Sequence, residues 1–257
     1  MDKTNRILII ATNADQFEKA GFRTGLWLSE LVHFWDVAEK AGYQMDIASP
    51  LGGKIPIDPE SLIISEVAHY VGMKGDVAKR YEDRTFMNLL ENTLKVADVD
   101  AQAYQALYMS GGHGVLFDFP KSDALAKLIA EFYESGKIIS AICHGPCGLL
   151  EVKLDNGDYL INGRNITSFS WKEEAVAKRD GTVPFNLEEE LKKRGAKYSK
   201  ATLPFNAHVV QDGLLITGQN PASASGVGKA VVKKLDEQER HIPAHTNNLS
   251  TSRITST

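Results

Sequence analysis

Cys143 and His144 are adjacent in the chain, and together they could act as a nucleophile and a base. Residues 138–142, directly before them, form a short apolar run rich in β-branched side chains, which predicts a strand buried on both faces. Small residues and leucines follow with helical spacing, so we expect Cys143 at a strand-to-helix corner. A helix N-terminus favours a thiolate, and the position predicts a nucleophile with a lowered pKa. The alternative is an ordinary buried cysteine.

Such a corner also allows adjacent side chains to meet. In a regular helix the side chains of neighbouring residues diverge, so His144 would not reach the sulfur. At a strained strand-to-helix turn, a nucleophile elbow, Cys143 leaves helical geometry and its sulfur can turn toward the imidazole. Ala141 and Gly145 are small enough to let strand and helix approach, and Pro146 suits a first helical turn.

A second glycine-rich corner follows another predicted strand and has the sequence Ser-Gly-Gly-His-Gly at residues 110–114. Paired glycines after a strand let backbone N–H groups come close to a ligand. A phosphate cradle is disfavoured, because neither a G-K-[ST] nor a G-x-G-x-x-G pattern opens a helix here. We expect instead that the N–H groups of Gly112 and His144 form an oxyanion hole, with His113 shaping the pocket.

The elements around these corners alternate between strands and helices. Short apolar runs predict four strands, at residues 6–12, 44–48, 106–109 and 138–142. With an amphipathic helix over residues 122–134, this order requires right-handed crossovers and a parallel sheet, whose carboxyl edge collects ligands. Farther on, residues 207–217 predict a hairpin with Asp212-Gly213 as its turn, and residues 222–235 a last helix.

An early predicted helix carries an acidic residue. Thr24 is a suitable N-cap, and apolar side chains recur with helical spacing until Gly42. Glu30 lies on this helix. The pattern alone favours a solvated acid over a carboxyl directed at the edge of the sheet.

Composition restricts the partners. The 257 residues carry a net charge of −4 with Lys and Glu interspersed, which argues against nucleic acid and membrane surfaces as partners. No apolar run approaches the roughly 18 residues of a membrane span. Cys143 and Cys147 form neither a disulfide framework nor a Cys-x-x-Cys pair, so a reducing cytoplasm fits best. His33, Glu66 and His69 lack the spacing of a zinc site, and we expect no metal.

Several separated blocks, in one order, resemble the DJ-1/PfpI superfamily and specifically its Hsp31-like branch of cofactor-independent glyoxalases and chaperones. The resemblance covers about residues 7–235. Its blocks are residues 24–30, 48–53, 58–59, 110–114, 141–150 and 217–221. It implies a flavodoxin-like three-layer α/β sandwich with a parallel sheet, a nucleophile elbow and a small cap insertion.

The same resemblance implies how the chain is divided. Residues 1–237 are expected to form one domain, in which about residues 55–95 contribute a cap over the active site. Residues 238–257 are polar, with little to bury, and we expect a flexible tail.

The resemblance also gives roles to three acids. It implies that Glu30 contacts the nucleophile, which reverses the preference from the pattern alone. It places the acid that orients the active-site histidine in the Glu-Glu pair, with Glu174 as first choice and Glu173 as second. The residue pattern equally allows this pair to be solvated charges at the start of a helix.

For function, the resemblance implies a glutathione-independent glyoxalase of the D-lactate dehydratase type, which converts methylglyoxal to lactate without cofactor or metal. Cys143 would attack the aldehyde to form a hemithioacetal, and the N–H groups of Gly112 and His144 would hold the oxyanion. His144 would shuttle protons. Gly111 and His113 would complete the substrate site. The expected partners are a small α-oxoaldehyde and a second copy of the chain in a homodimer.

Three other functions compete. A glutamine amidotransferase needs a downstream His-x-Glu, and His208 is followed by two valines. A cysteine peptidase or amidase of the PfpI kind keeps the Cys-His pair, and only the expected cap argues for a small substrate. A holding chaperone, with unfolded proteins as partners, requires an exposed apolar patch of several hundred Å².

Overall fold

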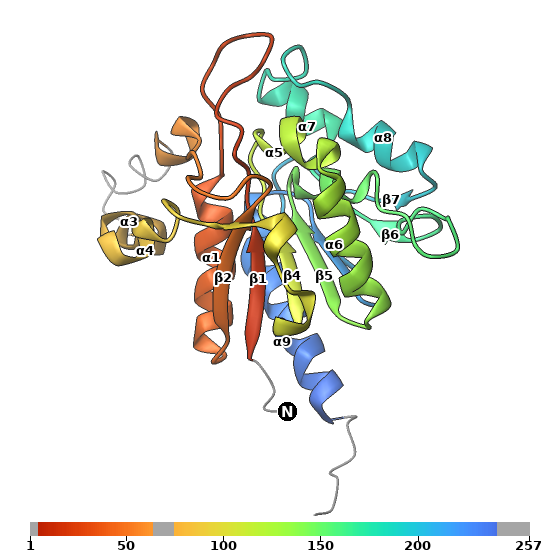
Figure 1. Cartoon of the computed structure of the whole chain (residues 1–257). Helices are drawn as coiled ribbons and strands as arrows, with labels where there is room; N and C mark the ends of the chain where they lie inside the picture. The colour runs from red at the N-terminus through yellow and green to blue at the C-terminus, as the bar shows by residue number, and fades with distance from the viewer. Residues whose placement is uncertain (1–4, 64–74, 241–257) are drawn as a thin grey trace, which may run out of the picture.

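The centre of the molecule is a seven-stranded sheet with helices on both faces (Figure 1). The computed structural model describes residues 5–63 and 75–240. The strand order is β3-β2-β1-β4-β5-β9-β8, and β8 is antiparallel to β9 while the other neighbouring pairs are parallel. The strands are β1 Arg6–Ile10, β2 Gln44–Ser49, β3 Leu94–Lys95, β4 Ala106–Met109, β5 Ile138–Ile142, β8 Val209–Asp212 and β9 Leu215–Gly218. A separate small sheet pairs β6 (Asn165–Ile166) with β7 (Lys197–Tyr198).

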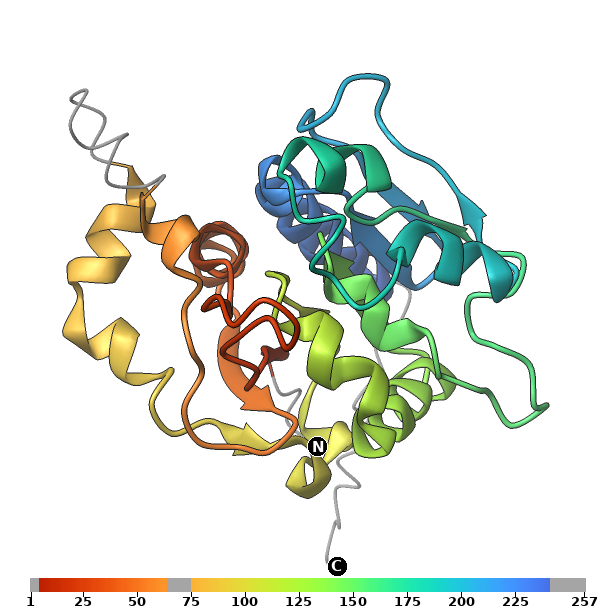
Figure 2. The ribbon, with the colours of Figure 1, turned by 90° about the horizontal axis from the view of Figure 1, so that it is seen from above.

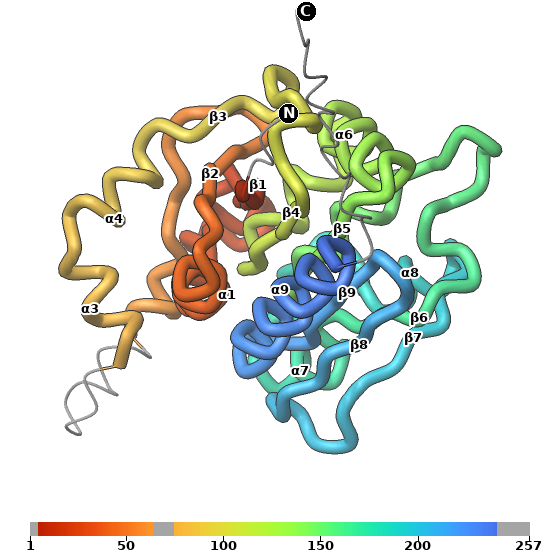
Figure 3. The backbone as a smooth tube through the Cα atoms, turned by 90° about the horizontal axis from the view of Figure 1, so that it is seen from below, coloured from red at the N-terminus to blue at the C-terminus, as the bar shows by residue number. Residues whose placement is uncertain are grey.

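Side chains of the central strands alternate between two hydrophobic layers, because successive residues of a strand point to opposite faces. Ile7 and Ile9 pack into the layer under α1 (Leu28–Lys40) and α9 (Ala224–Arg240), which lie side by side (Figure 3). Leu8 and Ile10 pack into the opposite layer, under α6 (Asp123–Glu134). The three-layer α/β sandwich predicted from the sequence is confirmed, with one antiparallel edge strand in its sheet.

The remaining helices are short. The α-helices are α3 Asp76–Glu82, α4 Arg84–Asn88, α5 Val115–Asp118, α7 Trp171–Val176 and α8 Leu187–Lys193. The 3₁₀ helices are η1 Val96–Asp98, η2 Ala101–Ala103, η3 Phe119–Lys121, η4 Gly145–Leu149 and η5 Pro221–Ser223. Within the described residues, no helix is both long enough and apolar enough to cross a membrane.

Two segments flank the carboxyl edge of the sheet, one on each side (Figure 2). The early segment, residues 50–63 and 75–93, contains α3 and α4 and packs beside α1. The late segment, residues 151–206, contains α7, α8 and the small sheet. The carboxyl ends of β4 and β5 therefore lie between two walls of different origin.

The start of α1 differs from the expectation. The helix begins at Leu28 without a side-chain cap, and Thr24 Oγ1 instead donates to Asp58 Oδ2 at 2.8 Å. The chain before the helix is fixed by pairing with the early segment, where the Leu26 N–H donates to the Pro56 carbonyl at 2.8 Å. This pairing takes Thr24 away from the helix start.

Two other boundaries also differ. The element after Cys143 is the 3₁₀ helix η4 rather than an α-helix. Helix α9 continues to Arg240, so the first three residues of the expected tail are helical, and residues 241–257 lie outside the described residues.

Candidate active site

Cys143 occupies a strained corner at the end of β5. Its φ is +58°, a conformation that costs a residue with a side chain about 1–3 kcal/mol. Two hydrogen bonds hold it there: its N–H donates to the Gly218 carbonyl at 2.9 Å, and its carbonyl accepts from the Phe169 N–H at 2.7 Å. A Cβ at Gly145 would lie 2.6 Å from the Met109 carbonyl oxygen, so a larger residue would displace the turn from β4. The nucleophile elbow predicted from the sequence is present.

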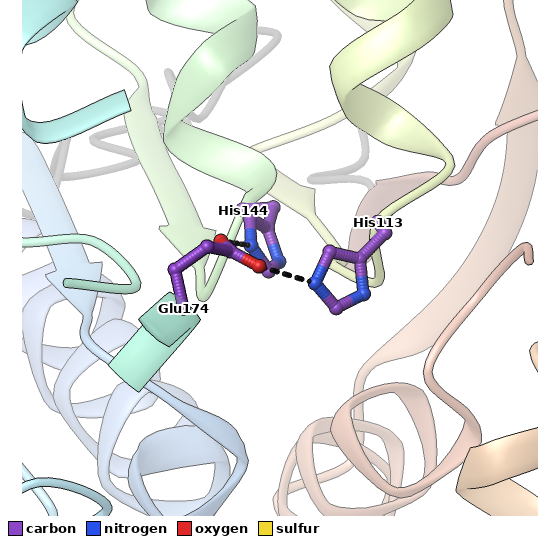
Figure 4. A group of neighbouring side chains, drawn as sticks. All are labelled: His113, His144 and Glu174. Atoms are coloured by element: carbon purple, nitrogen blue, oxygen red, sulfur yellow. Dashed lines mark hydrogen bonds and ion pairs between the residues drawn. The ribbon is translucent and has the colours of Figure 1, made fainter. Parts of the chain in front are cut away.

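A chain of short contacts runs from the sulfur to α7 (Figure 4 shows its histidines and acid). Cys143 Sγ lies 3.3 Å from His144 Nδ1, and His144 Nε2 lies 2.8 Å from Glu174 Oε2. On the other carboxylate oxygen, Glu174 Oε1 lies 2.7 Å from His113 Nε2. Of the two acids considered for this position, Glu174 is the one that contacts His144. The contact between His113 and Glu174 was not foreseen.

The shared carboxylate fixes the tautomers of both imidazoles. Burial raises the pKa of Glu174, but His144 and His113 outweigh it and hold this pKa well below its usual range. An ionised carboxylate only accepts hydrogen bonds, so His113 and His144 both donate from Nε2. Burial lowers the pKa of His144, which is therefore a neutral imidazole at physiological pH with a bare Nδ1 facing the thiol.

The expected low pKa of Cys143 is wrong. Burial, followed by the nearby Glu30 carboxyl, raises the pKa of this thiol well above its ordinary value. The sulfur belongs to a residue that is only 4% exposed, and the helix behind it is a single short 3₁₀ segment. Desolvation of a thiolate thus outweighs the helix N-terminus, and the resting residue is a thiol that can donate to His144.

Glu30 is completely buried behind the sulfur. Burial raises its pKa to about 8, although hydrogen bonds with Cys143 and with the Gly111 N–H work in the opposite direction. The Gly111 N–H donates to Oε2 at 2.9 Å, while Oε1 has no partner of good hydrogen-bond geometry. At neutral pH Glu30 therefore carries a proton that it can offer to the sulfur. Gly111 was expected to bind substrate, but its N–H donates to Glu30 instead.

The two expected oxyanion donors lie at the same corner. Among the described residues, neither the Gly112 N–H nor the His144 N–H has a hydrogen-bond acceptor. Gly112 has a φ of +106°, and a Cβ there would lie 2.2 Å from the Gly25 carbonyl oxygen. Only glycine fits this approach, which brings the N–H beside the elbow.

A cavity of about 410 Å³ opens over the sulfur. Its floor includes Gly112, His113, Cys143 and His144. Aromatic rings form much of its wall, namely those of Trp27, Phe169 and Phe205. The Phe169 ring centroid lies 4.6 Å from that of His144 and 6.2 Å from that of Phe205. The cavity suits a small molecule with an apolar part.

Glu173 organises the wall of this cavity rather than its floor. Fully buried, it accepts from Ser170 N–H and Oγ, from Phe205 N–H, and from the amides of Gln219 and Asn220, at 2.7–2.9 Å. With Ser170 it forms the capping box that starts α7. The Ser-x-x-Glu spacing was the sequence signal for this role, since a capping box fixes which acid turns back on the helix start. The neighbouring Glu174 is thereby directed at the histidines.

His113, His144 and Glu174 are also a possible ligand set for a metal ion, because their ligand atoms lie within 4.8 Å of one another. Two imidazoles and a carboxylate suit several transition metals. A metal would have to displace the Nε2 protons that now bind Glu174. Of the earlier metal candidates, His33 lies on α1, and Glu66 and His69 lie outside the described residues.

Known proteins with similar sequences and structures are numerous. Residues 23–234 match the sequence profile of the DJ-1/PfpI family. The glutathione-independent glyoxalase HSP31 of Saccharomyces cerevisiae is 32% identical over 225 residues, which cover 85% of this chain and 92% of the yeast protein. A probable glutathione-independent glyoxalase of Schizosaccharomyces pombe, hsp3103, is 31% identical over 261 residues, or 91% of this chain and 99% of the relative. The crystal structure of glyoxalase III from Candida albicans matches with a TM-score of 0.78 and 28% identity, covering 89% of this chain and 96% of that one.

Proposed function

Because the chain belongs to the DJ-1/PfpI family, we propose that it is a glutathione-independent glyoxalase that converts methylglyoxal and water to lactate. The observation that carries the proposal is the chain of contacts from Cys143 through His144 to Glu174 on the floor of a small cavity. Two unpaired backbone N–H groups and a buried carboxyl adjoin the sulfur. A base that removes the thiol proton and donors that hold the oxyanion both favour the addition of a thiol to an aldehyde.

The first step follows from the resting protonation states. His144 Nδ1 takes the thiol proton as the sulfur attacks C1, the aldehyde carbon, and the imidazolium that forms is stabilised by Glu174. The electrons of the C1=O bond move to oxygen, which the N–H groups of Gly112 and His144 hold. Glu30, protonated at neutral pH, donates to the sulfur as negative charge develops there.

The second stage is an internal redox rearrangement. Hydrogen moves from C1 to the neighbouring carbonyl carbon, C2, so that C1 is oxidised to a thioester while C2 is reduced to an alcohol. Water then hydrolyses the thioester, which releases lactate and restores the Cys143 thiol. Since oxidation and reduction occur within one molecule, the sequence consumes no external oxidant or glutathione.

Lactate formation from methylglyoxal tests the proposal. The purified protein is treated with a chelator and assayed without glutathione. Saturable lactate production that disappears in Cys143→Ala is the expected result. Failure to form lactate above the uncatalysed rate would overturn the proposal.

The cavity also bears on the peptidase or amidase alternative. Such an enzyme would use the same thiol and imidazole, but it must admit a stretch of polypeptide. The aromatic wall and the volume of about 410 Å³ favour a small substrate. Hydrolysis of a chromogenic peptide amide by the wild type, without lactate formation, would favour the alternative.

Three expectations about partners and setting complete the proposal. We infer a homodimer, the commonest closed assembly, and light scattering at micromolar concentration tests it. Binding of unfolded proteins would be a separate activity, and it requires an exposed apolar patch of several hundred Å². Suppression of aggregation of a thermally unfolded client by Cys143→Ala would separate it from catalysis. A reducing, cytoplasmic setting stays a prediction.

A further inference from the structure

Glu174 is shared by two imidazoles (Figure 4), and of these two only His144 contacts the sulfur. His144 uses Nε2 for the carboxylate and Nδ1 for Cys143. His113 uses Nε2 for the carboxylate, and its Nδ1 has no hydrogen-bond partner among the described residues. The ring centroids lie 4.3 Å apart, so the two imidazoles belong to one site.

His113 Nδ1 is available to a bound substrate. The tautomer imposed by Glu174 leaves this nitrogen bare, and Figure 4 shows it on the side of the ring away from the carboxylate. His113 lines the cavity beside Cys143. The residue as a whole is buried, but its unpaired Nδ1 atom keeps some exposure to solvent. The nitrogen is thus a proton acceptor open to the cavity.

The other proton acceptors near the cavity are committed. Glu60 lines it, but its carboxylate is ion-paired with Arg179 and its side chain is 49% exposed. His144 holds the thiol proton after the sulfur has attacked. Glu30 lies behind the sulfur and does not line the cavity among the described residues. For the hydrogen on C1, His113 is the uncommitted base.

We propose that His113 is a second catalytic base, which moves the carbon-bound proton while His144 serves the sulfur and the oxyanion. This inference rests on the proposed glyoxalase function. His113 Nδ1 takes the proton from C1, and the C–H electrons form a C1=C2 bond as the C2 carbonyl becomes an enolate oxygen. His144 returns the thiol proton to the oxygen on C1. His113 then delivers its proton to C2, the oxygen-bound proton passes from the C1 oxygen to the C2 oxygen, and C1 becomes the thioester carbonyl.

In this order of proton transfers only one imidazolium exists at a time, and the single negative charge of Glu174 can neutralise it. Two imidazolium rings at 4.3 Å would repel each other, and one carboxylate can neutralise only one of them. When His144 gives up its proton as His113 gains one, the pair carries one positive charge throughout. Glu174 keeps an N–H donor on each oxygen during the exchange.

The test separates carbon–hydrogen cleavage from thiol addition. His113→Gln retains an N–H donor for Glu174 but has no proton acceptor of useful strength. We expect kcat for methylglyoxal to fall at least ~100-fold, the usual size of a lost general base. With methylglyoxal deuterated at the aldehyde carbon, we expect the isotope effect on kcat to rise above that of the wild type, because cleavage of the C1–H bond becomes fully rate-limiting.

The isotope effect distinguishes catalysis from positioning. If His113 only holds Glu174, its loss slows thiol addition, and the isotope effect falls toward one. That result, or near-wild-type turnover in His113→Gln, would overturn the inference. Thermal unfolding shows whether the variant is folded, and His113→Asn serves if Gln is not tolerated. His33→Gln makes the same chemical change outside the cavity and should leave both measurements unchanged. Absence of lactate with the wild type would instead refute the glyoxalase function itself.

Discussion

The two segments that flank the sheet edge (Figure 2) contribute unequally to the cavity. From the early segment, Glu60 is the one described residue that lines it, whereas the late segment supplies Phe169, Ala177 and Phe205. The late segment also supplies Glu174. The expected cap over residues 55–95 therefore remains a proposal, while much of the described wall comes from later in the chain.

The early segment has a different role, which is to support α1. Arg80 binds Asp36 on this helix at 2.7 Å, and the Trp35 and Phe86 rings meet edge to face. Because α1 carries Glu30, the early segment supports the residue behind the sulfur, and Glu60 is its one described residue in the cavity wall. The difference teaches that the candidate catalytic residues lie mainly at the strand ends and on α7, so we expect changes in the two walls to have separate effects.

The largest expected effect comes from the sheet edge itself. Cys143→Ala should abolish turnover without loss of fold, because only the nucleophile is removed. Cys147→Ala is the matched control: its thiol is buried against the Val115 carbonyl at 3.2 Å and does not line the cavity. Lactate assays and thermal unfolding measure both. Equal loss of activity in two folded variants would contradict the assignment of Cys143.

One acid from each segment sharpens the comparison. Glu174→Gln should lower kcat about 10²–10⁴-fold, because the amide no longer neutralises an imidazolium and cannot accept from both histidines on equal terms. Glu60→Gln removes a partly exposed ion pair with Arg179 and should cost less than about fivefold. Steady-state kinetics on both variants provide the test. A larger loss in Glu60→Gln would mean that the early segment takes part in the chemistry.

Glu173→Gln should damage stability rather than chemistry. The amide would direct an NH₂ group at donors that now bind a carboxylate, which costs about 2–4 kcal/mol of unfolding free energy. The melting temperature should fall by about 5 °C or more. KM should rise, because Phe205 and Asn220 of the cavity wall lose their anchor. A variant with wild-type stability and a lost kcat would place Glu173 in the chemistry instead.

Glu30 on α1 should give an effect that builds up gradually, visible in the pH dependence of stability. Burial raises its pKa from 4.5 to about 8, so between these values the unfolded chain releases a proton that the folded chain keeps. The contribution of protonated Glu30 to the free energy of unfolding is fully present below about pH 4.5 and is lost as the pH rises toward 8. The stability of the wild type relative to Glu30→Gln should therefore fall by about 1 kcal/mol per pH unit across this range. Urea unfolding at pH 5 and pH 8 measures it, and a constant difference would mean that Glu30 is solvated.

The sheet edge could be predicted from the sequence because each part has a local signal. The strand before Cys143 and the paired glycines before His113 each lie within a short stretch, whereas the pattern alone favoured a solvated Glu30 and only the family resemblance placed it at this edge. A parallel sheet then gathers strand ends at one edge. Local patterns therefore suffice to identify the residues of the cavity floor.

The wall could not be predicted, because it depends on the path of long loops. Glu173 accepts hydrogen bonds from Phe205 and Asn220, which lie 32 and 47 residues away in the chain. No sequence pattern in either stretch predicts these contacts. The predicted direction of the Cys143 pKa shift was wrong for a related reason. A helix N-terminus can be predicted locally, whereas the depth of burial that outweighs it is a property of the whole fold.

The resting state of Cys143 has a consequence for the lifetime of the protein under oxidative stress. Peroxide reacts with the thiolate form of cysteine, and each further oxidation step is harder to reverse. A buried thiol with a raised pKa is therefore slow to enter this series. In the proposed mechanism His144 removes the proton as an aldehyde is attacked, so the sulfur would be reactive when substrate is present and slow to react between turnovers. The protein is expected to retain its nucleophile in surroundings that oxidise ordinary low-pKa cysteines.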